Sequence, residues 1–335
     1  MYTPEKYCAL LNEILEKDVS LIQAEKYQEI YDSLPENDNT AKFLLAKASI
    51  KYKEKGVAYR LLQELVFSAP ENPEYCGFLG HCLLGDNKFK ESISWLEQAY
   101  NLDSTNITVN ADLGIAYTSA FEFQKAVHLL EKAKEHYPNN PWVLCNLAQC
   151  YRQLGNNNLA INTAKNALYS SPMLDARLHT IIGGCLIELG KETEAIFHYE
   201  QAIDLENDSP SAYFGLSQSK KFRPTDQKII DKAISTLNRP QPEDEKIMMY
   251  FALGKMHDDI KEYKNAFEFF REGNLLKNSK IIYRPQEKLF EELQKTFTST
   301  FLERAREIGS TTKTPIFIVG MPRSGSTLVE QIISS

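Results

Sequence analysis

Residues 107–140 read ITVNADLGIAYTSAFEFQKAVHLLEKAKEHYPNN, and residues 141–174 read PWVLCNLAQCYRQLGNNNLAINTAKNALYSSPML. Aligned on each other, both stretches have Leu at position 7 and Tyr at position 11 (Tyr117 and Tyr151). A period of 34 residues is typical of repeat arrays, in which stacked helical units share one core. We therefore infer the architecture from this period before assigning any single helix.

Small residues recur with the same period on both sides of these two stretches. Position 8 is occupied by Ala46, Gly80, Gly114 and Ala148, position 20 by Ala58, Ser92, Ala126 and Ala160, and position 27 by Leu65, Ala99, Ala133 and Ala167. After one inserted residue the pattern continues through Gly183, Ala195 and Ala202. Because small side chains let two helices approach closely, we expect these positions to face neighbouring helices.

Helix-breaking residues are expected to separate the units. Position 32 is Pro70, Ser104, Pro138 and Pro172. Proline cannot continue a helix, so we expect each second helix to stop before this position. Weaker units are predicted over 5–38 and 247–280, and a degenerate unit over 210–244, where Lys220-Lys221-Phe222-Arg223-Pro224 interrupts the pattern.

The pattern resembles the tetratricopeptide repeat, a helix–turn–helix unit. It predicts an all-α superhelical solenoid of about eight units over residues 1–280, clearest over 39–209. The resemblance implies a protein or peptide partner on the concave face. No ordered Lys/Arg/Asn set of the kind that clamps a C-terminal carboxylate is visible, so the partner is not named by the sequence.

Composition excludes several other classes. Charged residues make up 25% of the chain and hydrophobic residues 43%, with a net charge of −7 and no basic stripe. Nucleic acid is therefore not an expected partner. We expect no membrane span, because no apolar stretch approaches the roughly 20 residues that one requires. With no signal peptide recognised either, a cytoplasmic location is expected.

Cysteine and histidine are expected to serve packing rather than metal binding. No cysteine pair has zinc-like spacing, and Cys82, Cys150 and Cys185 all occupy position 10 of their units. The six histidines are scattered, and no metal is expected. We also expect the aromatic residues at helical spacing, Tyr263, Phe267 and Phe270, to pack in the core.

After the repeats the pattern changes. Residues 281–314 are predicted to be a connecting helix (286–308) and a polar linker. Residues 315–319 read PIFIV, typical of a buried parallel strand, and a Gly/Ser loop and a helix start follow. Strand, loop and helix N-terminus in this order direct backbone N–H groups at one point, which suits a phosphate or sulfate group.

The composition of the loop narrows this prediction. Gly320 and Gly325 have the spacing of a Walker A loop, but Ser326 stands where that motif has Lys, which disfavours a standard kinase or ATPase. No cysteine lies near Arg323, which excludes a phosphatase loop of the Cys-x-x-x-x-x-Arg type. Arg323 and the hydroxyl of Thr327 remain as donors suited to sulfate or phosphate oxygens.

The string IFIVGMPRSGSTLVEQI (316–332) resembles the 5′-phosphosulfate-binding loop of sulfotransferases, and most of all the tyrosylprotein sulfotransferase-like branch. Bacterial members of that branch carry tetratricopeptide repeats before the sulfotransferase domain. The resemblance implies an α/β domain that begins at 315–335 and the donor substrate 3′-phosphoadenosine 5′-phosphosulfate (PAPS). The residues implied to hold its 5′-phosphosulfate are Arg323, Ser324, Gly325, Ser326 and Thr327, with Arg323 also stabilising the transition state.

In that family the catalytic base and the 3′-phosphate site lie after the loop, beyond Ser335. The expectation is therefore an N-terminal part of a sulfotransferase that is inactive by itself, with an unknown sulfate acceptor. The alternative is a non-enzymatic tetratricopeptide scaffold in which the terminal motif is a relic.

Overall fold

The computed structural model describes residues 38–51, 55–168, 172–205 and 209–280, together with residues 295, 298, 300, 301 and 304. The chain divides into two compact units, Met1–Asn278 and Ser279–Ser335. The predicted repeat at 5–38 and the terminal strand, loop and helix at 315–335 lie outside the described residues, as does most of the connecting helix. Within the described ranges all regular structure is helical, and none of the helices there is long and apolar enough to cross a membrane.

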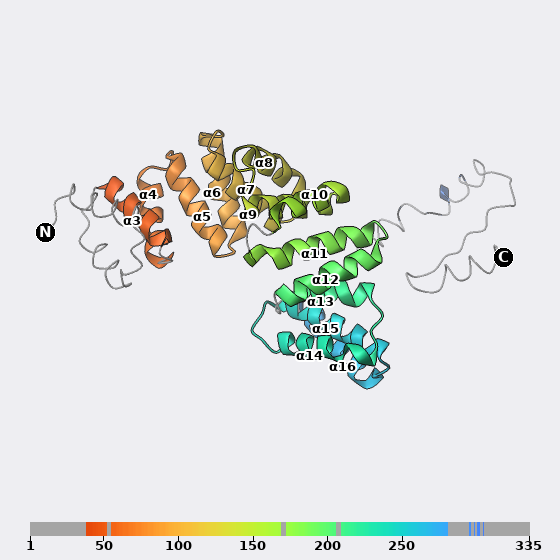
Figure 1. Ribbon diagram of the computed structural model, residues 1–335. Helices are drawn as coiled ribbons and strands as arrows, with labels where there is room; N and C mark the ends of the chain where they lie inside the picture. Colours follow the sequence, from red (N-terminus) through yellow and green to blue (C-terminus); the bar gives the residue numbers. More distant parts are fainter. Residues whose placement is uncertain are drawn as a thin grey trace. The chain divides into compact units, whose positions relative to one another are not determined.

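The helices follow one another as pairs (Figure 1). Their bounds are α3 Asn39–Lys51, α4 Lys55–Ser68, α5 Pro73–Gly85, α6 Phe89–Leu102, α7 Ile107–Ser119, α8 Phe123–His136, α9 Pro141–Gln153, α10 Asn157–Ala167, α11 Pro172–Glu188, α12 Glu192–Leu205, α13 Pro210–Ser219, η1 Pro224–Asp226, α14 Gln227–Leu237, α15 Glu243–Asp259 and α16 Tyr263–Lys280. The first helices of four successive pairs begin at Asn39, Pro73, Ile107 and Pro141, each 34 residues after the last. The predicted period is confirmed.

The small residues at position 8 lie where the two helices of a pair meet. A Cβ atom added to Gly80 would lie 2.5 Å from Cγ of Leu96, and one added to Gly114 would lie 2.7 Å from Cγ of Leu130. At position 20, the Ser92 hydroxyl donates a hydrogen bond of 2.8 Å to the carbonyl oxygen of Gly80. Close helix contact at these positions is therefore confirmed.

Two local features that the sequence reasoning missed also repeat every 34 residues. The N-cap residues Asn72, Asn106 and Asn140 each accept two backbone N–H bonds from the first turn of the following helix. The turn inside each hairpin contains a residue with positive φ: Asn87, Phe121 and Gly155, with φ of 59°, 64° and 78°. The Asn caps accept hydrogen bonds from backbone N–H groups that have no partner within the first turn of the helix. The residue with positive φ lets the chain reverse direction between the two helices.

The expected ends of the second helices are confirmed, and one expected core contact is wrong. Helix α10 ends at Ala167, before Pro172 as expected, and Pro172 is itself the first residue of α11, where a missing N–H costs nothing. In the degenerate unit, α13 and α14 are separated by a loop that is anchored by buried Phe222, whose N–H donates to Asp259. Tyr263 and Phe267 are not core residues, since they are 63% and 68% exposed. They lie on a face of α16 that no described helix covers, while Phe270 packs on Gly254 of α15.

Replacement of Ala126 by Leu is expected to destabilise the array. Ala126 is fully buried at position 20, and overpacking a close helix contact typically costs about 1–3 kcal/mol. Chemical denaturation of wild type and Ala126→Leu measures the difference. Gln124→Leu, on the exposed side of the same helix, is the matched control and is expected to change stability by less than about 0.5 kcal/mol. Equal stability of the two variants would contradict the repeat register.

Candidate functional site

The loop predicted to bind phosphosulfate lies outside the described residues. The roles given to Arg323, Ser324, Gly325, Ser326 and Thr327 therefore stay predictions. The concave features that the described residues form lie in the repeat array. Two of them adjoin each other along the first helices of successive units.

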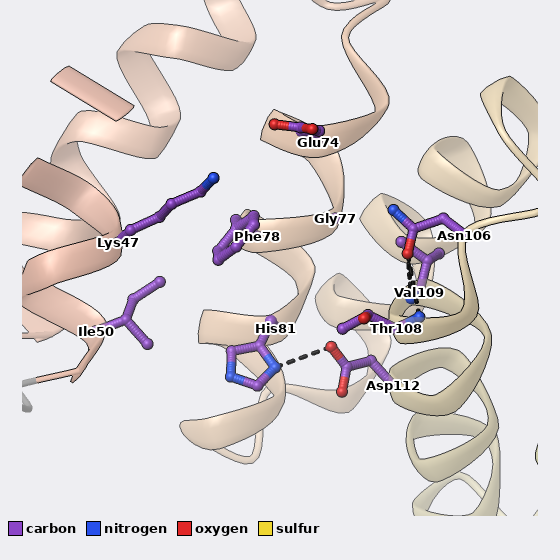
Figure 2. A pocket seen from close by; sticks show the side chains of 10 residues that line it. All are labelled: Lys47, Ile50, Glu74, Gly77, Phe78, His81, Asn106, Thr108, Val109 and Asp112. Carbon is purple, nitrogen blue, oxygen red and sulfur yellow. Dashed lines mark hydrogen bonds and ion pairs between the residues drawn. The ribbon is translucent and has the colours of Figure 1, made fainter. Parts of the chain in front are cut away.

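The first of these, pocket A, is a cavity of about 360 Å³ between α3, α5 and α7. It is lined by Lys47, Ile50, Glu74, Gly77, Phe78, His81, Asn106, Thr108, Val109 and Asp112 (Figure 2). Gly77 keeps its floor free of side-chain atoms, and an added Cβ there would lie 3.0 Å from Cγ2 of Val109. The walls formed by Ile50, Phe78 and Val109 make the interior apolar.

An aromatic cluster supports one side of pocket A. The rings of Phe43 and Phe78 meet edge to face, with centroids 5.2 Å apart. The ammonium group of Lys47 lies 4.1 Å from the ring centroid of Phe43 and 5.1 Å from that of Phe78. Such cation–π contacts can stabilise the positive charge of Lys47 at the rim of the apolar pocket, where the rings take the place of a carboxylate.

An ion pair joins α5 to α7 beside the pocket. Nδ1 of His81 lies 2.9 Å from Oδ2 of Asp112, and Figure 2 shows the two side chains facing each other. The hydrogen bond with Asp112 raises the pKa of the His81 imidazole, although partial burial opposes the shift. His81 and Asp112 line both pockets, so the pair forms the boundary between them.

The second cavity, pocket B, has a volume of about 710 Å³ and is lined mainly by α5, α7, α9 and α11. Its lining residues are His81, Leu84, Gly85, Asn87, Phe89, Thr108, Ala111, Asp112, Ile115, Ser119, Tyr137, Asn140, Trp142, Val143, Asn146 and Arg177. We call pockets A and B together the groove. Trp142 is 46% exposed, so it presents a large aromatic surface to this cavity.

Arg177 is held at the α11 side of pocket B by a buried amide. Nδ2 of Asn146 donates to the carbonyl oxygen of Trp142 at 2.8 Å, which orients the other end of the amide. Oδ1 of Asn146 then accepts a hydrogen bond of 3.3 Å from Nη2 of Arg177. Asn146 is only 2% exposed. This hydrogen bond orients the permanently charged, exposed guanidinium beside a cavity of mixed polarity.

Sequence reasoning missed these groove residues because they do not belong to the small-residue pattern. Phe78, Asp112 and Asn146 occupy the same position, position 6, in three successive units. They differ in chemistry from unit to unit, so the period by itself does not single them out. Variation at one fixed position on the first helices is the signal that would have identified them.

The remaining histidines and cysteines show one unexpected contact. Nδ1 of His179 lies 2.8 Å from Nδ1 of His198, and desolvation together with the neighbouring imidazole lowers the pKa of His198 to about 4. Among the described cysteines, Cys150 and Cys185 are buried free thiols, as expected, and burial raises the pKa of Cys185 to about 11. In the described ranges, His, Cys, Asp and Glu nowhere gather in a group of three that could hold a metal ion.

Comparison with protein families identifies the repeats. A model described as tetratricopeptide repeat matches residues 73–106, which are the unit formed by α5 and α6. A model described as anaphase-promoting complex, cyclosome, subunit 3 matches residues 119–219. A model described as sulfotransferase family matches residues 315–335. The chain therefore contains tetratricopeptide repeats, and the match to sulfotransferases is confined to the terminal segment.

Individual relatives cover parts of the chain. An uncharacterized protein of Aquifex aeolicus (strain VF5) is 34% identical over 161 residues, which are 45% of this chain and 21% of that protein. Small glutamine-rich tetratricopeptide repeat-containing protein 2 of Mycosarcoma maydis is 28% identical over 103 residues, 31% of this chain and 29% of that protein. The matched region thus spans less than a third of either relative.

Solved structures of MamA are similar to part of this chain. MamA AMB-1 is 23% identical with a TM-score of 0.44, and the match covers 50% of this chain and 99% of that one. MamA 41-end from Desulfovibrio magneticus RS-1 is 15% identical with a TM-score of 0.44, covering 51% and 96% of the two chains.

Titration by NMR is expected to show a pKa of His81 above its ordinary 6.5, and a lower one in Asp112→Asn. Because the folded state holds this proton more tightly than the unfolded chain, the pair stabilises the fold fully below pH 6.5. That contribution is lost as pH rises through the raised pKa. His198, with a pKa of about 4, is the internal control and should be the same in both proteins. An unchanged His81 titration in Asp112→Asn would contradict the ion pair.

Proposed function

We propose that this chain serves a sulfotransferase that uses PAPS, and that its repeat array docks a partner protein for that reaction. The observation that carries the proposal is the presence, in one chain, of tetratricopeptide repeats and a segment that matches the sulfotransferase family. The repeats supply a groove with apolar walls and fixed charges. The terminal segment supplies a donor set suited to an anion.

The residues of the terminal loop have separate roles in this proposal. Gly325 allows the backbone to approach the anion, and the hydroxyls of Ser324, Ser326 and Thr327 donate hydrogen bonds to its oxygens. PAPS supplies the sulfuryl group that is transferred. As the sulfur–oxygen bond to the donor lengthens, negative charge grows on the bridging oxygen, and Arg323 is assigned to stabilise that charge.

The donor set fits a phosphosulfate better than a nucleoside triphosphate. A P-loop lysine reaches the β- and γ-phosphates of ATP, and this loop has Ser326 at that position. A guanidinium and three hydroxyls match a compact group of sulfate and phosphate oxygens. We therefore assign no nucleoside triphosphatase activity.

A second candidate is a docking scaffold without transferase activity. It is favoured by the groove, which needs no residue of the terminal segment for its shape or charge. Both candidates share docking by the repeats. They differ in whether the chain contributes to a PAPS site.

Calorimetric titration of the full-length gene product with 3′-phosphoadenosine 5′-phosphate tests the difference. Wild type is expected to bind, and Arg323→Ala to lose at least ten-fold in affinity, because a charge-assisted bidentate contact is worth about 1.5–3 kcal/mol. Arg271→Ala removes an exposed arginine of α16 and should leave the affinity unchanged. Failure of the wild type to bind would favour the scaffold, and equal affinity of Arg323→Ala and wild type would refute the loop assignment.

A further inference from the structure

We propose that the groove binds an extended segment of a partner protein that places an apolar side chain in pocket A and an acidic side chain on Arg177. The inference rests on the proposed docking function of the repeats and adds the chemistry of the partner. Four observations on the groove carry it: the hydrogen bonding of Arg177, the pairing of polar groups in pocket B, the apolar walls of pocket A, and the separation of the two contacts.

Arg177 has unused capacity for an acidic group. Its hydrogen bond to Asn146 engages one of five N–H donors, and the acceptor is a neutral amide. Among the described residues, Arg177 has no carboxylate partner within ion-pair distance. Asn146 is buried and hydrogen-bonded to the backbone of Trp142, so it gives the exposed guanidinium one fixed hydrogen-bond partner before any partner protein arrives. A positioned guanidinium binds a carboxylate at lower entropic cost than a mobile one.

The pairing of polar groups in pocket B leaves Arg177 open to an acidic partner. Asp112 is the acidic side chain among its lining residues, and His81 already occupies that carboxylate. The Asp112 carboxylate is therefore engaged by His81, and among the described residues no ion pair joins it to Arg177. Complementary charge at such a site selects the partner more than it sets the total affinity.

Pocket A suits a different kind of side chain. Its walls are the apolar groups of Ile50, Phe78 and Val109, and its volume is about 360 Å³. The amine of Lys47 lies over the aromatic cluster at the rim. A buried acidic group would gain little on the apolar walls, whereas a leucine, methionine or phenylalanine side chain would bury apolar surface.

The helix spacing gives the separation of the two contacts. Pocket A lies beside α5, and Asn146, which holds Arg177, lies on α9; α5 contacts α7, and α7 contacts α9. Packed helices are about 8–10 Å apart, so the two contacts are separated by roughly 16–20 Å. An extended chain rises about 3.3 Å per residue and crosses this distance in five or six residues. A helix, at 1.5 Å per residue, would need about twelve.

Selection of random 16-residue peptides displayed on phage tests the proposal. The probes are wild type, Arg177→Glu and Arg177→Gln, with Lys165→Glu as the matched charge reversal on the exposed face of α10, outside the groove lining. A selected peptide is taken to depend on the groove if it loses binding to the Ile115→Arg variant, in which the larger side chain fills pocket B. Circular dichroism establishes that each variant is folded.

Wild type and Lys165→Glu are expected to select peptides with an apolar residue five or six positions from Asp or Glu. Arg177→Glu should select Lys or Arg at that acidic position, and Arg177→Gln should lose the acidic preference. A synthetic peptide of the selected sequence should bind wild type at least ten-fold more weakly when its acidic residue is replaced by Lys. The Arg177→Glu variant should bind that Lys peptide with the original affinity.

The contrary outcomes are distinct. The inference would be overturned if the peptides that depend on the groove showed no preference for an acidic residue. It would also be overturned if the Arg177→Glu variant selected the same acidic residue as wild type. In both cases the docking function of the groove would stand. A spacing near twelve residues would refute the extended segment. If no selected peptide loses binding to Ile115→Arg, both the inference and the docking function of the groove fail.

Discussion

The contact between a glycine at position 8 and the side chain at position 24 of the same unit sets the geometry of the helical hairpins. Leu96 lies on Gly80, Leu130 on Gly114, Tyr199 on Gly183 and Phe270 on Gly254, each at a distance that an added Cβ atom would not tolerate. The partner changes from leucine to tyrosine to phenylalanine while the glycine is kept. In these four units the glycine lets the first helix come close enough for a large side chain of the second helix to cover its backbone, and in two other units the small residues Ala46 and Ala148 take this position. The buried alanines at positions 20 and 27 extend the same close approach to neighbouring helices.

The groove is a consequence of that packing. When small residues and their partners bury one face of each first helix, another face is left to line pockets A and B. The polar contacts across this face join successive units. His81 with Asp112 and Asn146 with Arg177 are each 31 residues apart in the chain. A repeated backbone thus supports contacts whose chemistry differs from unit to unit. The core can stay uniform while the groove becomes specific, because the two use different positions of the same repeat.

Docking and chemistry are divided between separate parts of the chain in the proposed sulfotransferase. The repeats contribute apolar walls, the positioned Arg177 and the charge boundary at His81, none of which is suited to transfer a sulfuryl group. The terminal loop contributes a guanidinium and hydroxyls, which suit an anion but do not by themselves select a protein acceptor. Selectivity for a partner would then come from the groove and reactivity from the loop, each alterable without the other.

The amino-acid sequence by itself determined the period, the ends of the second helices and the small positions, since these follow from local spacing and from which residues helices tolerate. The chemistry proposed for residues 320–327 also rests on the sequence, because it depends on neighbouring residues in one loop. Only the tertiary structure decided which side chain covers each glycine, that His179 meets His198, and that Asn146 holds Arg177. It also decided that Tyr263 and Phe267 are exposed. Helical spacing shows which residues share a face, but burial and pairing depend on what another part of the chain places against that face.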